Sequence, residues 1–168
     1  MNGSKTLEKE FLEVLEGHKG VIYKVANAYQ SDPEERQDLI QEIILQLWRA
    51  FPKYDPTFAL TTWIYRISLN VAISQLRKAT SQRKRRESYA EVLAFAQDEA
   101  REEQDEQVRQ LYRFIEGLKP LDKAIVILFL EGKGNKEIAE IMGITASNVS
   151  TRMHRIKQRM TAHFKPNT

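Results

Sequence analysis

Hydrophobic residues recur along the chain at helical spacing, and no stretch alternates apolar and polar residues as a half-buried strand would. The first run is carried by Leu7, Phe11 and Leu15. Gly17 follows it, and we expect that glycine to end the helix. A second helix is expected from about Lys19 to Tyr29.

The next helix has a clear start signal. Asp32 can cap it, Pro33 suits its first turn, and two glutamates follow at the positive end of the helix dipole. Phe51–Pro52 is expected to end it. A loop of residues 53–61 then leads to a helix over about residues 62–78. The expected core positions of that helix are Trp63, Ile64, Ile67, Val71 and Leu76.

Apolar periodicity fades after residue 79 and returns at Val108. We interpret residues 79–105 as a linker that separates two helical modules. In the second module, Gly117–Leu118–Lys119–Pro120 breaks one helix, and Pro120 opens the next.

The last part of the chain predicts a helix-turn-helix. Ile138, Ile141 and Met142 share one face of a short helix, Gly143 ends it, and Thr145 can cap the helix that follows. Ala139 lies on the inner face, where a small side chain lets two helices approach closely. The second helix is expected to bury Val149, Met153 and Ile156 and to expose Ser147, Asn148, Thr151, Arg152 and Arg155.

A helix with this polar and basic outer face fits the major groove, where its hydroxyl, amide and guanidinium groups can reach base edges. We expect Lys136 to lie near phosphate. The alternative is an ordinary helical hairpin with a solvated basic face.

Composition narrows the function class. The 168 residues are 42% hydrophobic and 29% charged, which suits a soluble helical protein. We find no membrane-spanning run and no signal-peptide core, and we expect a cytoplasmic location. There is no cysteine, and the three histidines are scattered, so we expect no metal site, no cofactor and no catalytic base.

Charge is distributed in blocks, although the net value is only +3. Residues 77–86 carry six basic side chains and no acidic one, residues 87–106 have a net charge of −7, and residues 107–168 have a net charge of +6. Such blocks suggest a nucleic-acid surface beside a segment that mimics or avoids it.

Two motifs in the first module specify the function further. Asp38–Leu39–Ile40–Gln41–Glu42 lies on one predicted helix, and Thr62–Trp63–Ile64–Tyr65–Arg66–Ile67–Ser68–Leu69–Asn70 lies on the next. In this order, and with a C-terminal helix-turn-helix, they resemble the bacterial extracytoplasmic-function sigma factors over about residues 7–159. The sequence departs from the usual pattern at Ile44, where an aromatic is common, and at Ser147–Asn148, which affects the promoter sequence that is read.

The resemblance implies an all-α protein with two small helical domains joined by a charged linker. Sigma region 2 would span residues 5–78, the linker residues 79–105, and the helix-turn-helix of sigma region 4 residues 106–165. Region 4 would read the upstream promoter element. Region 2 would bind core RNA polymerase and open the downstream element.

The resemblance also assigns roles to residues of region 2. The polymerase-binding face would comprise Asp38, Gln41 and Glu42. The loop that captures a flipped base would use Lys53, Tyr54, Phe58 and Thr61. The helix beneath the melted strand would contribute Trp63, Arg66, Asn70 and Arg77.

Physical chemistry is consistent with the loop assignment. A duplex base must leave the stack before its pairing edge can be read, and aromatic faces return about 1–3 kcal/mol per stacked base.

Simpler interpretations of these residues stay open at this point. Trp63 can belong to the core, Tyr54 and Phe58 can hold the loop together, Asp38 and Glu42 can be solvated charges, and Arg83–Arg86 can be a solvated linker.

The sequence thus predicts a non-enzymatic alternative sigma factor whose partners are core RNA polymerase, promoter DNA and an anti-sigma factor. We expect no small-molecule substrate and no membrane insertion. The alternatives are a stand-alone helix-turn-helix regulator, for which residues 134–139 also fit, and an enzyme, for which no convergent catalytic set exists.

Overall fold

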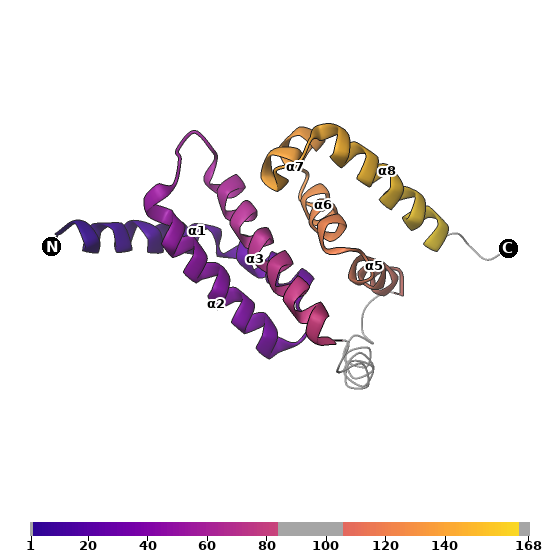
Figure 1. The fold of residues 1–168 in the computed structure, drawn as a ribbon, viewed down its shortest axis with the longest axis horizontal. Coiled ribbons are helices and arrows are strands. Elements are labelled where there is room, and N and C mark those ends of the chain that lie inside the picture. Colours follow the sequence, from indigo (N-terminus) through magenta and orange to yellow (C-terminus); the bar gives the residue numbers. More distant parts are fainter. Residues whose placement is uncertain (1, 84–105, 165–168) are drawn as a thin grey trace.

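The computed structural model describes residues 2–83 and 106–164, and every regular element within those ranges is a helix. Helices α1 to α3 form one group and α5 to α8 a second group, and the start of α1 and the end of α8 lie on opposite sides of the molecule (Figure 1). The all-α, two-module architecture predicted from the hydrophobic pattern is confirmed. Most of the expected linker, residues 84–105, lies outside the described residues.

The first group consists of α1 (Asn2–Tyr29), α2 (Pro33–Ala50), a short 3-10 helix η1 (Phe51–Lys53) and α3 (Leu60–Arg83). Asp32 caps α2 as predicted, because its Oδ2 accepts the backbone N–H of Glu35 at 3.0 Å. The three long helices pack against one another. Their shared core is built from Phe11, Ile22, Val25, Tyr29, Leu39, Ile43, Leu47, Ile64, Tyr65, Leu69 and Ala72.

The predicted break at Gly17 is wrong, because α1 runs without interruption from Asn2 to Tyr29. Phe11, Ile22, Val25 and Tyr29 are all buried, so one apolar face continues along the helix past the glycine. A glycine inside a helix costs about 1 kcal/mol relative to alanine, which is too little to end a helix whose face is buried on both sides.

Helix α3 differs from its prediction in length and in its buried face. It begins at Leu60 and continues to Arg83. Tyr65, Ser68, Leu69 and Ala72 are buried along with the expected Ile64, whereas Trp63, Ile67, Val71 and Leu76 are only half-buried. The reason is that α3 packs against α1 and α2 on one side and α6 and α7 on another, so two faces are covered.

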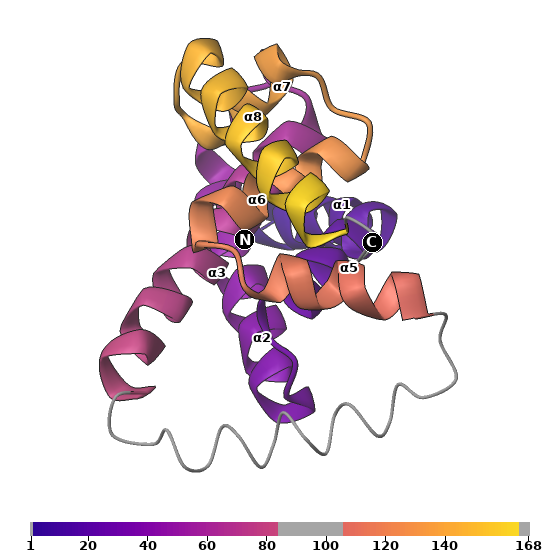
Figure 2. The same ribbon diagram turned by 90° about the vertical axis from the view of Figure 1, so that its right-hand side faces the viewer.

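The second group consists of α5 (Glu106–Glu116), α6 (Pro120–Leu130), α7 (Asn135–Met142) and α8 (Ala146–His163). Figure 2 turns this group toward the viewer, and α8 packs against both α6 and α7. Its core contains Ile125, Leu128, Ile138, Ile141, Val149, Met153 and Ile156. The order of these helices and the buried residues of α8 follow the prediction, whereas Val108 of α5 and Phe129 of α6, which continue the apolar repeats of their helices, are exposed.

The two groups are in contact through polar and apolar side chains. The hydroxyl of Tyr29 donates to the carbonyl of Pro120 at 2.8 Å, and Lys123 Nζ lies 5.3 Å from the centroid of the Tyr29 ring. Lys24 Nζ is 2.9 Å from Glu131 Oε2. Burial, and then the neighbouring Glu131, raise the pKa of Tyr65 to about 12. These contacts join α1 to α6 and the residue that follows it, and α3 packs directly against α6 and α7.

None of the helices in the described ranges has the length and apolar character needed to cross a membrane. Residues 2–83 and 106–164 also contain no group of three or more acidic and histidine side chains arranged to hold a metal ion.

Candidate nucleic-acid interface

The turn between α7 and α8 has the predicted geometry. Gly143 adopts φ 69° and ψ 32°, the left-handed conformation that glycine takes at the lowest cost. The backbone N–H of Ile144 then bonds the carbonyl of Ala139 at 3.1 Å. Thr145 Oγ1 accepts the backbone N–H of Asn148 at 3.1 Å and so caps α8. Local chemistry therefore defines the angle at which α8 leaves α7.

The outer face of α8 carries the polar residues that the sequence predicted there. Ser147, Asn148, Thr151 and Arg155 are exposed. Thr151 donates its hydroxyl to the carbonyl of Ser147 at 3.0 Å, which leaves its oxygen lone pairs facing outward. Lys136, in the first turn of α7, is exposed as well. These side chains form one surface beside the turn that can enter a groove of DNA.

Arg152 differs from the other residues on this surface because it is held inside the protein's own structure. Its Nε donates to Asn148 Oδ1 at 3.0 Å, and its Nη1 lies 3.0 Å from Asp122 Oδ1 on α6. The Asp122 side chain is only 14% exposed and that of Arg152 33% exposed. Sequence reasoning missed Asp122, because the two partners are thirty positions apart and no local spacing connects them.

The loop between η1 and α3 is closed by its own aromatic residues. The hydroxyl of Tyr54 donates to the carbonyl of Phe58, and the Tyr54 ring lies 5.1 Å from that of Trp63. The guanidinium of Arg66 lies 5.5 Å from the centroid of the Phe58 ring. Asp55 accepts the backbone N–H of Thr57 at 3.0 Å, and this hydrogen bond lowers the pKa of its carboxyl group. In this structure Tyr54 and Phe58 hold the loop together.

An aromatic chain beneath the loop was not predicted. The Phe11 ring lies 5.1 Å from Trp48 and 5.3 Å from Phe51, and the Phe51 ring lies 6.2 Å from Trp63. Trp63 is half-buried within this chain of rings, which agrees with the alternative that it belongs partly to the core. Of the other loop residues singled out from the sequence, Lys53 is exposed and Thr61 is half-buried.

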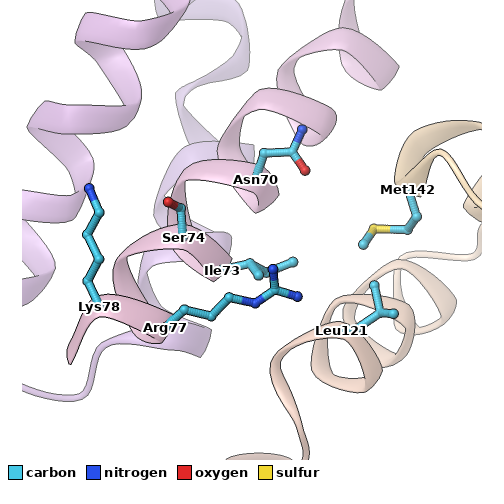
Figure 3. A pocket seen from close by; sticks show the side chains of 7 residues that line it. All are labelled: Asn70, Ile73, Ser74, Arg77, Lys78, Leu121 and Met142. Carbon is cyan, nitrogen blue, oxygen red and sulfur yellow. The ribbon is translucent and has the colours of Figure 1, made fainter. Parts of the chain in front are cut away.

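Three polar residues of α3, Arg66, Asn70 and Arg77, face the second group of helices. Arg66 donates to the carbonyl of Ile141 at 3.3 Å and to that of Glu140, both at the C-terminal end of α7. Asn70 and Arg77 line a cleft of about 510 Å³ between α3 and the α6–α7 pair, shown in Figure 3. Its remaining lining residues are Ile73, Ser74, Lys78, Leu121 and Met142.

The three residues predicted to bind polymerase lie along α2. Asp38 and Gln41 are exposed, and Glu42 is half-buried and accepts a hydrogen bond from Gln46 at 2.9 Å. Leu45, one position before Gln46, leaves 39% of its surface exposed. Asp38 and Glu42 are one helical turn apart, so both carboxylates can meet the same basic surface.

The sequence resembles known proteins over most of its length. A model of Sigma-70 region 2 matches residues 14–82, and a model of Sigma-70 region 4 matches residues 108–160. The RNA polymerase sigma factor SigV of Bacillus subtilis is 26% identical over 156 residues, which cover 92% of this chain and 91% of SigV.

Two solved structures share the fold. The sigma factor RpoE of Bartonella quintana, solved in complex with the anti-sigma factor NepR, is similar with a TM-score of 0.66 and 18% identity, covering 98% of this chain and 99% of RpoE. CnrH, solved in complex with the cytosolic domain of CnrY, is similar with a TM-score of 0.65 and 16% identity, covering 92% of this chain and 87% of CnrH.

Proposed function

Because this chain belongs to the extracytoplasmic-function group of the sigma-70 family, whose members are non-enzymatic RNA polymerase subunits that direct transcription initiation, we propose how its residues divide that task. We assign residues 5–78 to region 2 and residues 106–165 to region 4, with residues 79–105 between them. Because RNA polymerase acts in the bacterial cytoplasm, we place this protein there.

Region 4 reads the upstream promoter element through the outer face of α8. The observation that carries this proposal is the capped turn, in which Gly143 and Thr145 present Ser147, Asn148, Thr151 and Arg155 as one exposed surface. Arg152 supports that surface from its flank. Lys136 supplies a phosphate contact that orients the helix without reading sequence.

Region 2 captures the melted downstream element. The loop offers the exposed cation of Lys53 beside the rings of Tyr54 and Phe58, with Thr61 and Trp63 at its base. Arg66, Asn70 and Arg77 extend a polar track along α3 that can follow a strand's backbone. Since aromatic side chains stack on bases regardless of sequence, this composition favours single-stranded over duplex DNA.

The acidic face of α2 docks on core polymerase. Asp38, Gln41 and Glu42 supply two carboxylates and an amide, and Leu45 adds exposed apolar surface beside them. A charged rim around an apolar contact steers association and sets the orientation of docking. An anti-sigma factor would regulate the protein by covering one or both DNA-binding regions, as the complex of the similar RpoE with NepR suggests.

Reconstituted transcription tests the proposal. The purified chain is combined with core polymerase and supplied with a library of duplex promoters that are randomised at both elements and carry an identifying barcode downstream of the start site, and the barcodes in the run-off transcripts are sequenced. We expect transcripts from templates that share two sequence elements, whereas core polymerase alone should enrich neither. Enrichment of no element by the assembled enzyme would contradict the proposal.

A further inference from the structure

Asn148 is fixed at both its backbone and its side chain. Its backbone N–H donates to Thr145 Oγ1 at 3.1 Å, and its side-chain oxygen accepts Arg152 Nε at 3.0 Å. The N–H of an arginine can only donate, so the amide atom that faces it must be the oxygen. The orientation of the amide is therefore determined by its partner, and its NH₂ group is the part left for another molecule.

Arg152 is in turn fixed by Asp122. The carboxylate belongs to the first turn of α6, which packs against α8, and it lies 3.0 Å from Arg152 Nη1. Its side chain is 14% exposed, so the charged pair is largely shielded from solvent. One guanidinium thus connects a carboxylate of the supporting helix to the amide of an exposed residue on α8.

We propose that Asp122 and Arg152 are positioning residues that hold Asn148 with its NH₂ group outward, and that Asn148 thereby selects against cytosine at one position of the upstream element. In the major groove guanine offers acceptors at O6 and N7, adenine offers one at N7, and thymine offers one at O4. Cytosine offers only its N4 donor. An amide held as a donor can pair with the first three and meets an unfavourable donor on cytosine.

This inference rests on the proposed role of region 4, and it makes Arg152 a support rather than a base reader. Loss of Asp122 would release Arg152 and let the Asn148 amide rotate. The rotated amide could then accept from cytosine, so discrimination would be lost at that one position. Removing a carboxylate near DNA should also raise affinity for every sequence, which is opposite to the effect of simply damaging the fold.

The test uses the full chain assembled with core polymerase, and a duplex DNA library randomised over the upstream element as the probe. Bound DNA is sequenced for the wild type and for Asn148→Ala, Asp122→Ala and Arg152→Lys. In the wild type we expect cytosine to be depleted about tenfold at one position of one strand, the size of a base-edge contact. All three variants should lose that depletion at the same position and keep their other preferences.

Arg152→Lys separates charge from geometry. Lysine retains the charge of Arg152 but has a single ammonium group, which cannot bond Asn148 and Asp122 in the geometry of a guanidinium.

Glu137→Ala is the matched control, because Glu137 is also an acidic residue at the third position of a helix in the same domain, and it is exposed. It should leave the cytosine depletion unchanged. A double-mutant cycle adds a second measurement: in an Asn148→Ala background, Asp122→Ala should cause no further loss at this position.

Three results would overturn the inference: cytosine accepted by the wild type at every position, Asp122→Ala reducing all preferences alike, or Asp122→Ala altering a position different from that of Asn148→Ala. A wild-type enzyme that enriches no upstream sequence at all would instead contradict the proposed function of region 4. Thermal melting of each variant confirms that the protein used for binding is folded.

Discussion

Two arginines on α8 show how their surroundings decide what a guanidinium can do. Arg155 is exposed, whereas Arg152 is held by a carboxylate of α6 and an amide of α8. Only the first can reach a base edge without breaking contacts within the protein. At the scale of single residues, whether an arginine can contact a base therefore depends on its exposure and its existing partners, and not on residue type alone.

Arg155 and Lys136 should affect DNA binding in different ways. Replacing Arg155 with alanine should cost about 1–3 kcal/mol on the preferred sequence and relax one position of specificity. Lys136→Ala should weaken binding to all sequences alike and reduce the salt slope by about one, because a phosphate contact carries no sequence information. Binding of the assembled enzyme to matched and mismatched duplexes over a salt series measures both.

Lys9→Ala is the control for that comparison, since Lys9 is exposed near the start of α1 and outside both proposed DNA surfaces. It should leave the affinity and the salt slope unchanged. Equal loss by Arg155→Ala on matched and mismatched duplexes would remove Arg155 from the base-reading set.

At the scale of elements, the aromatic residues of the loop between η1 and α3 close the loop, and in the proposed function they also stack on bases. The Tyr54 hydroxyl closes the loop on Phe58, and its ring packs against Trp63. Tyr54→Phe therefore removes only the closing hydrogen bond, whereas Tyr54→Ala with Phe58→Ala removes the stacking surfaces. We expect the double variant to bind core polymerase and closed promoter DNA but to lose open complex.

A pre-melted bubble template should rescue the double variant, because the unstacking cost is already met there. Tyr54→Phe should open duplex promoters nearly as well as the wild type. Permanganate footprinting on duplex and bubble templates measures both effects. Base capture by this loop would have to be abandoned if the double variant opened duplex promoters normally.

The glycines of the helices give a prediction about stability. A Cβ added at Gly17, Gly20 or Gly143 would meet no atom within 4 Å, but only Gly143 has a positive φ. Gly17→Ala and Gly20→Ala should each stabilise the protein by about 0.5–1 kcal/mol, because alanine loses less backbone entropy in a helix. Gly143→Ala should destabilise it by roughly 1–2 kcal/mol through left-handed strain. Urea denaturation of the three variants measures these changes in the free energy of unfolding.

The elements with local signals were predictable, and those that depend on distant contacts were not. Asp32, Gly143 and Thr145 act within one helical turn, so their capping roles were evident from the sequence. The uninterrupted α1 could not be predicted, because a glycine breaks a helix only when no buried face continues past it. The Asp122–Arg152 pair and the contact of Arg66 with α7 join residues far apart in the chain, and no periodicity encodes them.

At the scale of the whole molecule, region 4 covers part of the polar face of α3, whereas the outer face of α8 stays exposed. Arg66 bonds carbonyls of α7, and Asn70 and Arg77 open into the cleft between α3 and the α6–α7 pair. If α3 carries the melted strand as proposed, the modules must separate before that strand can bind. The Lys24–Glu131 ion pair and the Tyr29–Pro120 hydrogen bond hold them together in the meantime.

A reversible cross-link tests whether that separation is required. The chain contains no cysteine, so Lys24→Cys with Glu131→Cys can be joined selectively by a short bismaleimide that contains a cleavable disulfide. We expect the cross-linked protein to lose promoter-dependent transcription and to regain it after reduction. The uncross-linked double variant is the control and should be active. Wild-type transcription by the cross-linked protein would contradict the requirement.

The contact of Arg66 with the C-terminal end of α7 has a thermodynamic consequence. In the proposed function, a DNA strand that takes this guanidinium from α7 removes one link between the modules, and so lowers the free energy needed to separate them, which binding to both promoter elements requires. By reciprocity, DNA bound to region 4 lowers the cost of engaging Arg66. The two promoter elements are then coupled ligands, and the free energy of their joint binding is more favourable than the sum of the separate values by the free energy of opening, which is spent only once.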